Sequence, residues 1–235
     1  MPIWNLKELR SSVERLHGRD QRSAITPSLD SIHQRREFAR YHYHEAQRLI
    51  SDVVTPEDSE MQVMQLIMGV DEEASAVFQM AGFQAAAHIT ACLQSMHTVA
   101  DLLAHTLYYA LGMNIDPAKN IDPRRVGLHS VSRHIPEGAL KRHLKTLVEH
   151  DDFVYLSAIT NHSKHRSIVK ANYSLDLTGD SPTPHGLKFS RFEYDGKTYP
   201  ERWVWPTLES EYKRQAEIVV SVGLALNNAL EANIW

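Results

Sequence analysis

The chain has 235 residues, a length that suits one domain or one domain with an insertion. Apolar residues make up 43% of it and charged residues 23%, which excludes a disordered chain and indicates an ordinary globular protein. A single cysteine, Cys92, excludes an internal disulfide and favours a reducing compartment. The first residues lack the basic head and apolar run of a signal peptide, so we expect a cytoplasmic protein. The formal net charge of −4 excludes a surface that is positive throughout.

The first half of the chain is predicted to be helical. After an irregular start, the pattern indicates a helix from Ser28 to about Val53, because Pro27 precedes it and Pro56 follows its end. The sequence Thr55-Pro56-Glu57-Asp58 is typical of a helix start, with proline at the first position and acidic residues in the first turn. The helical pattern then continues to about Met113, and we expect any break in it at Gly69 or Gly82.

One part of this helical stretch has the length of a membrane span. Residues 74 to 100 contain no Asp, Glu, Lys or Arg. Polar side chains that are costly in lipid interrupt the run every few residues, namely Gln79, Gln84, His88, Gln94 and His97. We therefore predict the central helix of a soluble bundle and no contact with a membrane.

The middle of the chain is predicted to hold a loop and two further helices. Residues 114–134 are rich in Asn, Pro and Gly and are typical of a loop. A helix is expected from near Pro136 to about His150. Asp151 or Asp152 can then cap a helix that carries Phe153 to about Arg166.

A change of period predicts a β insertion. Apolar and polar residues alternate from Val169 to Thr178, as in a strand with one buried face. After a Gly- and Pro-rich loop, residues 187–194 and 197–199 flank Asp195-Gly196 and predict a hairpin with a two-residue turn. Residues 203–205 are a further short strand in this interpretation, and Thr207 caps a last helix that reaches about Ala232.

Together these elements predict a mainly α protein, a helical bundle with a small antiparallel β-sheet inserted before the C-terminal helix. We expect a single domain over residues 1–235. The bundle would comprise residues 28–168 and 207–232, and the β insertion residues 169–205.

Most common enzyme signatures are missing from the sequence. There is no glycine-rich nucleotide loop, no CxxC pair and no GxSxG motif. His44-Glu45 begins a zinc-protease pattern, but Arg48 stands where its second histidine is needed. We therefore expect no cofactor.

The segment from Ile159 to Arg166 carries the main candidate site. In a helix, Val154, Ala158, Asn161 and His165 share one stripe, and the first two are apolar. Asn161 and His165 are therefore expected to point inward or to line a groove, with Lys164 and Arg166 on either side of the stripe.

The Asn-x-x-Lys-His pattern of Asn161, Lys164 and His165 resembles a recurring segment of bacterial helical proteins. It also resembles, more remotely, the Arg-Asn-x-x-x-His helix of the HEPN superfamily. Members of that superfamily are helical bundles, often dimeric, and many are metal-independent RNases. Asn161 matches the asparagine and His165 the histidine, whereas Thr160 stands in the place of the arginine. The resemblance covers only this segment and the order of the helices.

The resemblance implies an RNA-associated homo-oligomer, and a metal-independent endoribonuclease that Thr160 makes degenerate. His165 would take the proton of a ribose 2′-hydroxyl as general base. Lys164 or Arg166 would supply positive charge to the transition state, and Asn161 would orient the imidazole or bind phosphate. In the alternative, Asn161 and His165 only satisfy buried backbone groups. The chain would then be a non-enzymatic interaction protein that dimerises through its helices.

The charge distribution offers RNA a partner surface. Between Lys119 and Lys170 there are ten Lys or Arg residues against five Asp or Glu residues, and six of the fourteen histidines also lie there. Such a window predicts a local anion-binding face. The alternative is a solvated surface of uneven charge.

A second candidate site is a metal site. His97, Asp101 and His105 lie four residues apart on one helix face, a spacing that lets neighbouring pairs share a metal ion. A further ligand would come from His162 or His165. This pattern predicts either a metal-binding helical-bundle enzyme or a hydrogen-bonded polar seam. We expect Asn161 and His165 to lie within a side-chain length of this stripe, because polar groups in a core pair with one another.

Two further groups of residues stand out in the sequence. Tyr41, His42, Tyr43 and His44 lie beside a basic ridge, which is most often a solvated helix face. The aromatic residues of the β insertion either stack on bases or cover the inner face of the sheet.

Overall fold

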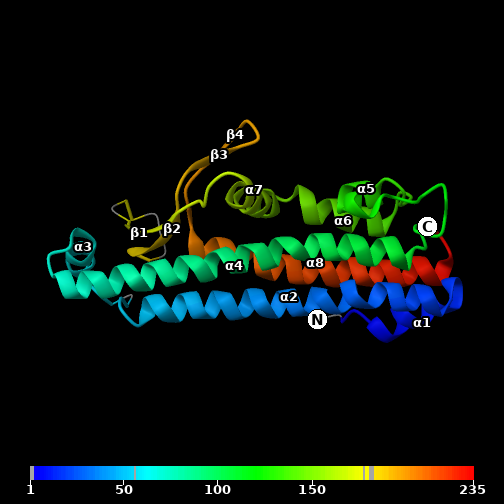
Figure 1. Ribbon diagram of the computed structural model, residues 1–235, viewed down its shortest axis with the longest axis horizontal. Coiled ribbons are helices and arrows are strands. Elements are labelled where there is room, and N and C mark those ends of the chain that lie inside the picture. The colour runs from blue at the N-terminus through cyan, green and yellow to red at the C-terminus, as the bar shows by residue number, and fades with distance from the viewer. Residues whose placement is uncertain (1–2, 56, 177, 180–182) are drawn as a thin grey trace. The chain divides into compact units, whose positions relative to one another are not determined.

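The computed structural model describes residues 3–55, 57–176, 178–179 and 183–235 (Figure 1). It is 68% helical, with eight α-helices in the described residues and a small antiparallel sheet before the C-terminal helix. The fold class predicted from the sequence is confirmed.

The chain divides into two compact units. Unit 1 comprises Met1–Glu37, Met96–Val154 and Glu211–Trp235, and unit 2 comprises Phe38–Ser95 and Tyr155–Ser210. Each unit thus combines segments that are far apart in the sequence. The division of residues 1–235 into one bundle and one insertion stays a prediction.

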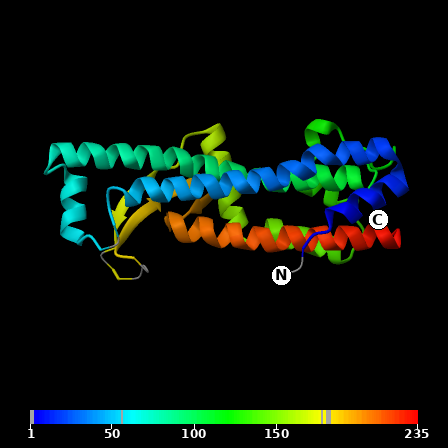
Figure 2. The ribbon, with the colours of Figure 1, turned by 90° about the horizontal axis from the view of Figure 1, so that it is seen from below.

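The N-terminal residues form two helices, so the predicted irregular start is wrong. Helix α1 (Leu6–His17) is capped by Asn5, whose side chain accepts a hydrogen bond from the Glu8 amide, and lies beside the start of α2 (Figure 2). Helix α2 (Arg19–Ser51) continues through Pro27. A proline inside a helix costs about 3 kcal/mol, but burying an aliphatic side chain gains about 1.5–3 kcal/mol. Ile25, Leu29 and Ile32 are all buried at helical spacing, and their burial outweighs the proline.

The predicted helix from Thr55 to Met113 is two helices. Helix α3 (Glu60–Met68) begins after Ser59, which forms a capping box with Gln62. The predicted start at Thr55 is therefore wrong, and Pro56 lies outside the described residues. Gly69 ends α3 in the left-handed conformation (φ 75°), so the break expected at Gly69 or Gly82 occurs at the first. Helix α4 (Glu72–Ala110) follows.

The remaining helices follow the sequence prediction with shifts at their ends. The predicted loop over residues 114–134 contains two short elements, η1 (Pro123–Arg125) and α5 (Leu128–Ser132). Helices α6 (Ala139–Glu149) and α7 (Asp151–His165) lie close to their predicted bounds. Helix α8 (Val204–Ala232) begins before Thr207, so the predicted cap is wrong. Pro206 is tolerated because the first turn of a helix needs no amide donor.

The β insertion forms two small antiparallel sheets. Strands β1 (Ala171–Leu175), β2 (His185–Phe189) and β5 (Arg202–Trp203) lie in the order β1-β2-β5, with Ala171 opposite Phe189. Strands β3 (Phe192–Tyr194) and β4 (Lys197–Tyr199) form the predicted hairpin. Both turn residues, Asp195 and Gly196, have positive φ, as a two-residue hairpin turn requires.

Aromatic side chains of the insertion cover the sheet inside unit 2. Tyr155 of α7 packs against Phe189 and Phe192, and the Arg202 guanidinium lies 4.2 Å from the centre of its ring. Phe189 and Phe192 are buried. For these residues the covering interpretation is confirmed.

Helix α3 rests on β1 and on the start of α4. Buried Val63 packs in one cluster with Val54 and Phe78, against which Tyr173 and Leu175 of β1 also pack. Buried His185 ties this corner together, because its Nδ1 accepts from the Tyr173 hydroxyl (2.8 Å) and its Nε2 donates to the Asp58 carbonyl (3.1 Å). The platform under α3 is therefore well packed.

Helix α4 is the one described helix that is long and apolar enough to cross a membrane, by length and composition alone. One third of its most apolar window is buried (33%). The core helix of a soluble protein passes the same test.

Trp4 covers the C-terminal helix in unit 1. Its indole lies on Gly223 of α8, where an added Cβ would stand 2.1 Å from the ring atom Cδ2. The indole Nε1 donates to Asn227 Oδ1 (3.4 Å), and the Asn227 amide donates to the Asn5 carbonyl (3.0 Å). Only glycine fits at position 223 without displacing Trp4.

We predict opposite effects on stability for two Gly→Ala substitutions in helices. Gly223→Ala forces the indole of Trp4 out of place and should lower the free energy of unfolding by about 1–3 kcal/mol, the usual cost of overpacking. Gly82→Ala in α4 meets nothing within 4 Å and should raise it by about 0.5–1 kcal/mol. Urea denaturation followed by circular dichroism measures both. A Gly223→Ala protein as stable as the natural one would contradict the Trp4 contact.

Candidate functional site

The candidate residues of the segment from Ile159 to Arg166 lie at the C-terminal end of α7. Lys164, His165 and Arg166 are exposed, and Asn161 is half-buried with its amide directed to Ser157 Oγ of the same helix (3.3 Å). The expectation that His165 points inward is therefore wrong. The stripe is buried at Ala158, together with Tyr155, Leu156 and Ile159, but the last residues of α7 extend beyond this packing and are exposed.

Thr160, in the position of the superfamily's arginine, faces the interior. It is only 1% exposed, and its hydroxyl has no hydrogen-bond partner among the described residues. Its side chain therefore does not lie on the surface that carries Lys164 and His165. In this chain Thr160 therefore contributes to the packing of α7 and brings no positive charge to that surface.

Two of the candidate residues fasten the hairpin β3–β4 to α7. The Arg166 guanidinium lies 5.1 Å from the ring centre of Tyr194 and donates to the Glu193 carbonyl (3.4 Å). The His162 ring packs on Phe192 (5.5 Å between centres), while its Nδ1 donates to the Ser167 carbonyl (2.7 Å). Arg166 and His162 therefore stabilise the packing of the hairpin. Lys164 and His165 make no such contact within the described residues.

The predicted metal stripe lies in unit 1 and is partly exposed. His97 stacks on Phe153 with a ring distance of 6.2 Å, His105 lies beside Tyr109, and Asp101 is exposed. These three residues are no part of the metal-ligand cluster found among the described residues. The expectation that Asn161 and His165 meet this stripe stays a prediction, because they belong to unit 2.

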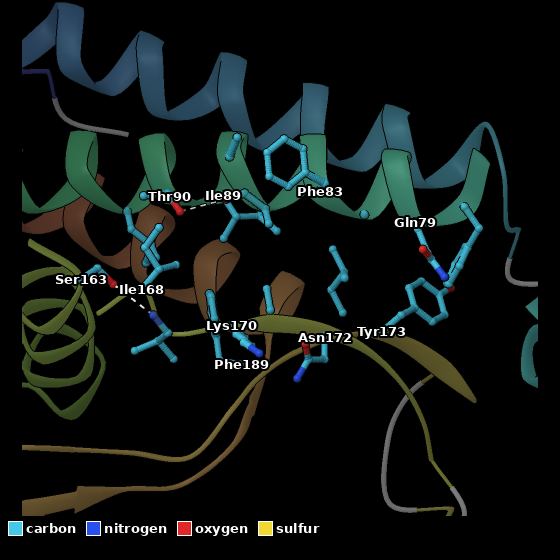
Figure 3. A pocket seen from close by; sticks show the side chains of 18 residues that line it. Gln79, Phe83, Ile89, Thr90, Ser163, Ile168, Lys170, Asn172, Tyr173 and Phe189 are labelled. Carbon is cyan, nitrogen blue, oxygen red and sulfur yellow. Dashed lines mark hydrogen bonds between the residues drawn. The ribbon is translucent and has the colours of Figure 1, made fainter. Parts of the chain in front are cut away.

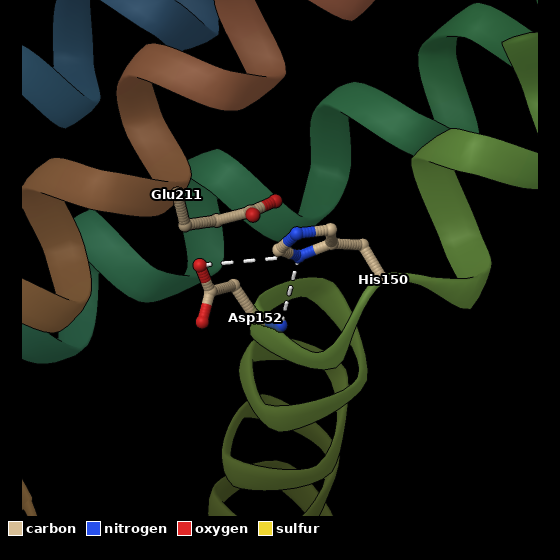
Figure 4. A group of neighbouring side chains, drawn as sticks. All are labelled: His150, Asp152 and Glu211. Atoms are coloured by element: carbon tan, nitrogen blue, oxygen red, sulfur yellow. Dashed lines mark hydrogen bonds and ion pairs between the residues drawn. The ribbon is translucent and has the colours of Figure 1, made fainter.

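That cluster joins His150, Asp152 and Glu211, whose ligand atoms lie within 4.8 Å of one another (Figure 4). Burial raises the pKa of the Glu211 carboxyl, and the Arg214 guanidinium opposes this rise. Arg214 holds both Glu211 oxygens, at 2.6 and 2.8 Å, and also donates to the carbonyls of Thr146 and Leu147 near the end of α6. Arg214 thus donates hydrogen bonds to carbonyls that the end of α6 leaves without a partner inside the helix.

This cluster was not predicted from the sequence. Its signals were the Glu211-x-x-Arg214 spacing within a helix and the His150-x-Asp152 pair between two helices. Both patterns are common on protein surfaces. Only the burial of Glu211 distinguishes this cluster from an ordinary surface pair, and the sequence does not reveal that burial. A metal ion would have to share Glu211 with Arg214, which already neutralises it.

A histidine pair lies in unit 2, between α2 and α4. The Nδ1 atoms of His42 and His88 are 2.9 Å apart, so one ring donates a hydrogen bond to the other. Tyr41 packs edge-on against both rings. Burial lowers the pKa of His42 below its ordinary value, and repulsion from a charged His88 lowers it further.

We predict that this pair weakens the protein in mild acid. Because the pKa of His42 is lower in the folded state, the unfolded chain takes up a proton first as the pH falls below about 6.5. The free energy of unfolding should therefore fall between pH 7 and pH 5, and His42→Gln should make this fall shallower. His44→Gln is the control, because His44 is exposed on the same helix. Equal slopes in the natural protein and in His42→Gln, from urea denaturation at each pH, would contradict the prediction.

A basic hollow in unit 1 belongs to the predicted anion-binding window. It has a volume of ≈ 580 Å³, and its lining comes from the loop and short helix between Asn120 and His134. Arg125, His129, Arg133 and His134 all line it. Asp122, its one carboxylate, pairs with Arg124 (3.5 Å). Neither Arg125 nor Arg133 pairs with a carboxylate within the described residues, so both guanidinium groups are available to an anion.

Comparison with family models, with curated proteins and with solved structures finds no match for this chain.

Proposed function

We propose that the chain is an RNA-associated, HEPN-like protein that holds the phosphate backbone of RNA in the basic hollow of unit 1. The observation that carries this proposal is the set of side chains around the hollow, two arginines without a carboxylate partner and two histidines. An arginine presents a planar fork of donors that matches a phosphate group. The volume of ≈ 580 Å³ leaves room for a phosphate together with part of its nucleotide.

The segment at the end of α7 suits binding better than cleavage. Lys164 and His165 are exposed and available to a second phosphate, but Thr160 is buried and brings no charge to them. Arg166 is engaged with Tyr194 and the Glu193 carbonyl, which leaves Lys164 as the one candidate cation beside His165. A lysine is a point charge and lacks the planar fork with which an arginine holds a phosphoryl group. We therefore propose a degenerate nuclease that binds RNA and does not cut it, in a cytoplasmic homo-oligomer.

We predict that RNA binding weakens as the salt concentration rises, and that the arginines of the hollow cause part of this dependence. Each phosphate contact on single-stranded RNA contributes about 0.7 to the slope of log K against log salt concentration. Arg125→Ala with Arg133→Ala should lower this slope by about 1.4 in fluorescence anisotropy titrations with a labelled oligoribonucleotide. Arg15→Ala with Arg19→Ala removes the same charge from exposed positions on or beside α1 and should leave the slope unchanged.

An equal loss of slope in both double variants would contradict a specific role for the hollow. Tight binding of pyrophosphate with no binding of RNA would assign the hollow to a small anion instead.

Cleavage is tested separately, by incubating a structured RNA without divalent metal. We predict intact RNA with the natural protein and with His165→Ala. Products that form with the natural protein and disappear with His165→Ala would contradict a binding-only protein and make His165 a catalytic residue.

A further inference from the structure

Helix α3 is apolar on two opposite sides. Val63 and Leu66 pack inward, on the cluster that joins α3 to β1 and α4. Met61, Met64, Ile67 and Met68 point outward and are exposed, Met68 by 72%. An apolar helix side is normally covered by another part of a protein. The described residues of this chain cover only the inner side of α3.

The exposed apolar surface continues on the first turns of α4. Val77 and Met80 are more than half exposed, and Phe83 is 73% exposed. Monomeric soluble proteins rarely expose so many large apolar side chains next to one another, and such patches mark binding sites. Methionine is the common residue on surfaces that adapt to an apolar partner, because its side chain is flexible.

Phe83 also stands at the edge of an apolar groove between α4 and β1. The groove has a volume of ≈ 540 Å³, and its lining includes Phe78, Ile89 and Leu93 on the side of α4. Figure 3 shows Phe83 on the helix and Ile168 and Tyr173 on the side of the strand. Ile168 is 65% exposed, so both edges of the groove present apolar side chains to solvent.

Exposed acidic residues lie just before α3 and at the starts of α3 and α4, next to the apolar surface. No Lys or Arg lies between Arg48 and Lys119 in the sequence, and the acidic residues of this stretch concentrate around α3. Glu57, Glu60, Glu72 and Glu73 are exposed, and none of them has an ion-pair partner within the described residues. Lys170, at the strand side of the groove, is the one cation in the lining.

We propose that the surface formed by α3, the start of α4 and the adjoining groove binds an amphipathic helix of a partner protein, with Lys and Arg on the polar face of that helix. Its apolar side would cover the methionines and insert a large side chain between Phe83 and Ile168. Its basic side would meet the unpaired glutamates. This site lies in unit 2 and is independent of the RNA proposal, which rests on unit 1.

The charges select this occupant over two others. A second copy of the chain would bring the same glutamates face to face, and like charges across an interface oppose binding. An anionic lipid surface would be repelled for the same reason. A basic helix is the partner that satisfies both the apolar surface and its charged border.

The test is a calorimetric titration of the full chain with a designed amphipathic helical peptide of Leu and Lys. We expect one peptide to bind per chain, and a peptide with Glu in place of Lys to bind at least about tenfold more weakly. Met68→Ser with Phe83→Ser should weaken binding of the Leu/Lys peptide at least about tenfold. Ile115→Ser with Ile234→Ser is the matched control, since both residues are exposed in unit 1 and should not matter.

A second set of variants isolates the charges. Glu60→Gln with Glu72→Gln and Glu73→Gln should weaken binding several-fold at low salt and have little effect at high salt, because exposed charges are screened. Circular dichroism of every variant verifies that the fold is kept.

Several results would overturn the proposal. Equal binding of the Lys and Glu peptides would contradict a basic partner. Equal binding by both serine double variants would contradict the location of the site on α3 and α4. A dimer of the natural chain in sedimentation equilibrium that Phe83→Ser abolishes would give the surface to a second copy. Binding of the natural chain to uncharged phosphatidylcholine vesicles, lost in the same variant, would give it to a membrane.

Discussion

The uncharged stretch of α4, residues 74 to 100, imposes the constraint on which much of unit 2 depends. Such a helix needs apolar partners over most of its surface. The chain supplies such partners on one side, where the β insertion packs Tyr173 against Phe78 with 5.2 Å between their ring centres. Ala85 and Ile89 are buried further along the helix. The insertion between α7 and α8 is therefore a cover for α4, and this explains why a mainly helical chain contains a sheet.

At the beginning of α4 that cover reaches Phe78 but leaves other apolar side chains exposed. Val77, Met80 and Phe83 follow one another at the spacing of helical neighbours, yet none of them is buried. The turn at Gly69 sets α3 against β1 through Val63 and leaves the methionines of α3 outside. Unsatisfied apolar surface and unpaired glutamates thus occur on the same two helices. A binding surface for an external helix accounts for both features together.

Local sequence patterns predicted the helices, strands and turns better than they predicted which face of each helix is buried. The two-residue turn at Asp195-Gly196 and the break at Gly69 follow from backbone geometry that few residues adopt, and both were predictable. The helix through Pro27 was not, because the energy that keeps it comes from side chains packed by distant segments.

The candidate site shows the same limit. Asn161 and His165 do share a helical stripe, but the stripe is buried only at Ala158 and is exposed at His165, because the packing partners of α7 end before its last turn. The buried Glu211–Arg214 pair was missed because its importance comes from the carbonyls at the end of α6. Ionisable groups separate by region in the finished fold, with arginines around the hollow of unit 1 and glutamates around α3 in unit 2.

Hydrogen exchange measured by mass spectrometry tests the central claim most directly, which is that the outer face of α3 and α4 is an open binding surface. The full chain is compared with and without a saturating amphipathic peptide of Leu and Lys. The account predicts slower amide exchange within residues 60–87 and 168–173, and no change within residues 120–134. Protection that falls on the basic hollow, or that is spread evenly over the chain, would contradict it.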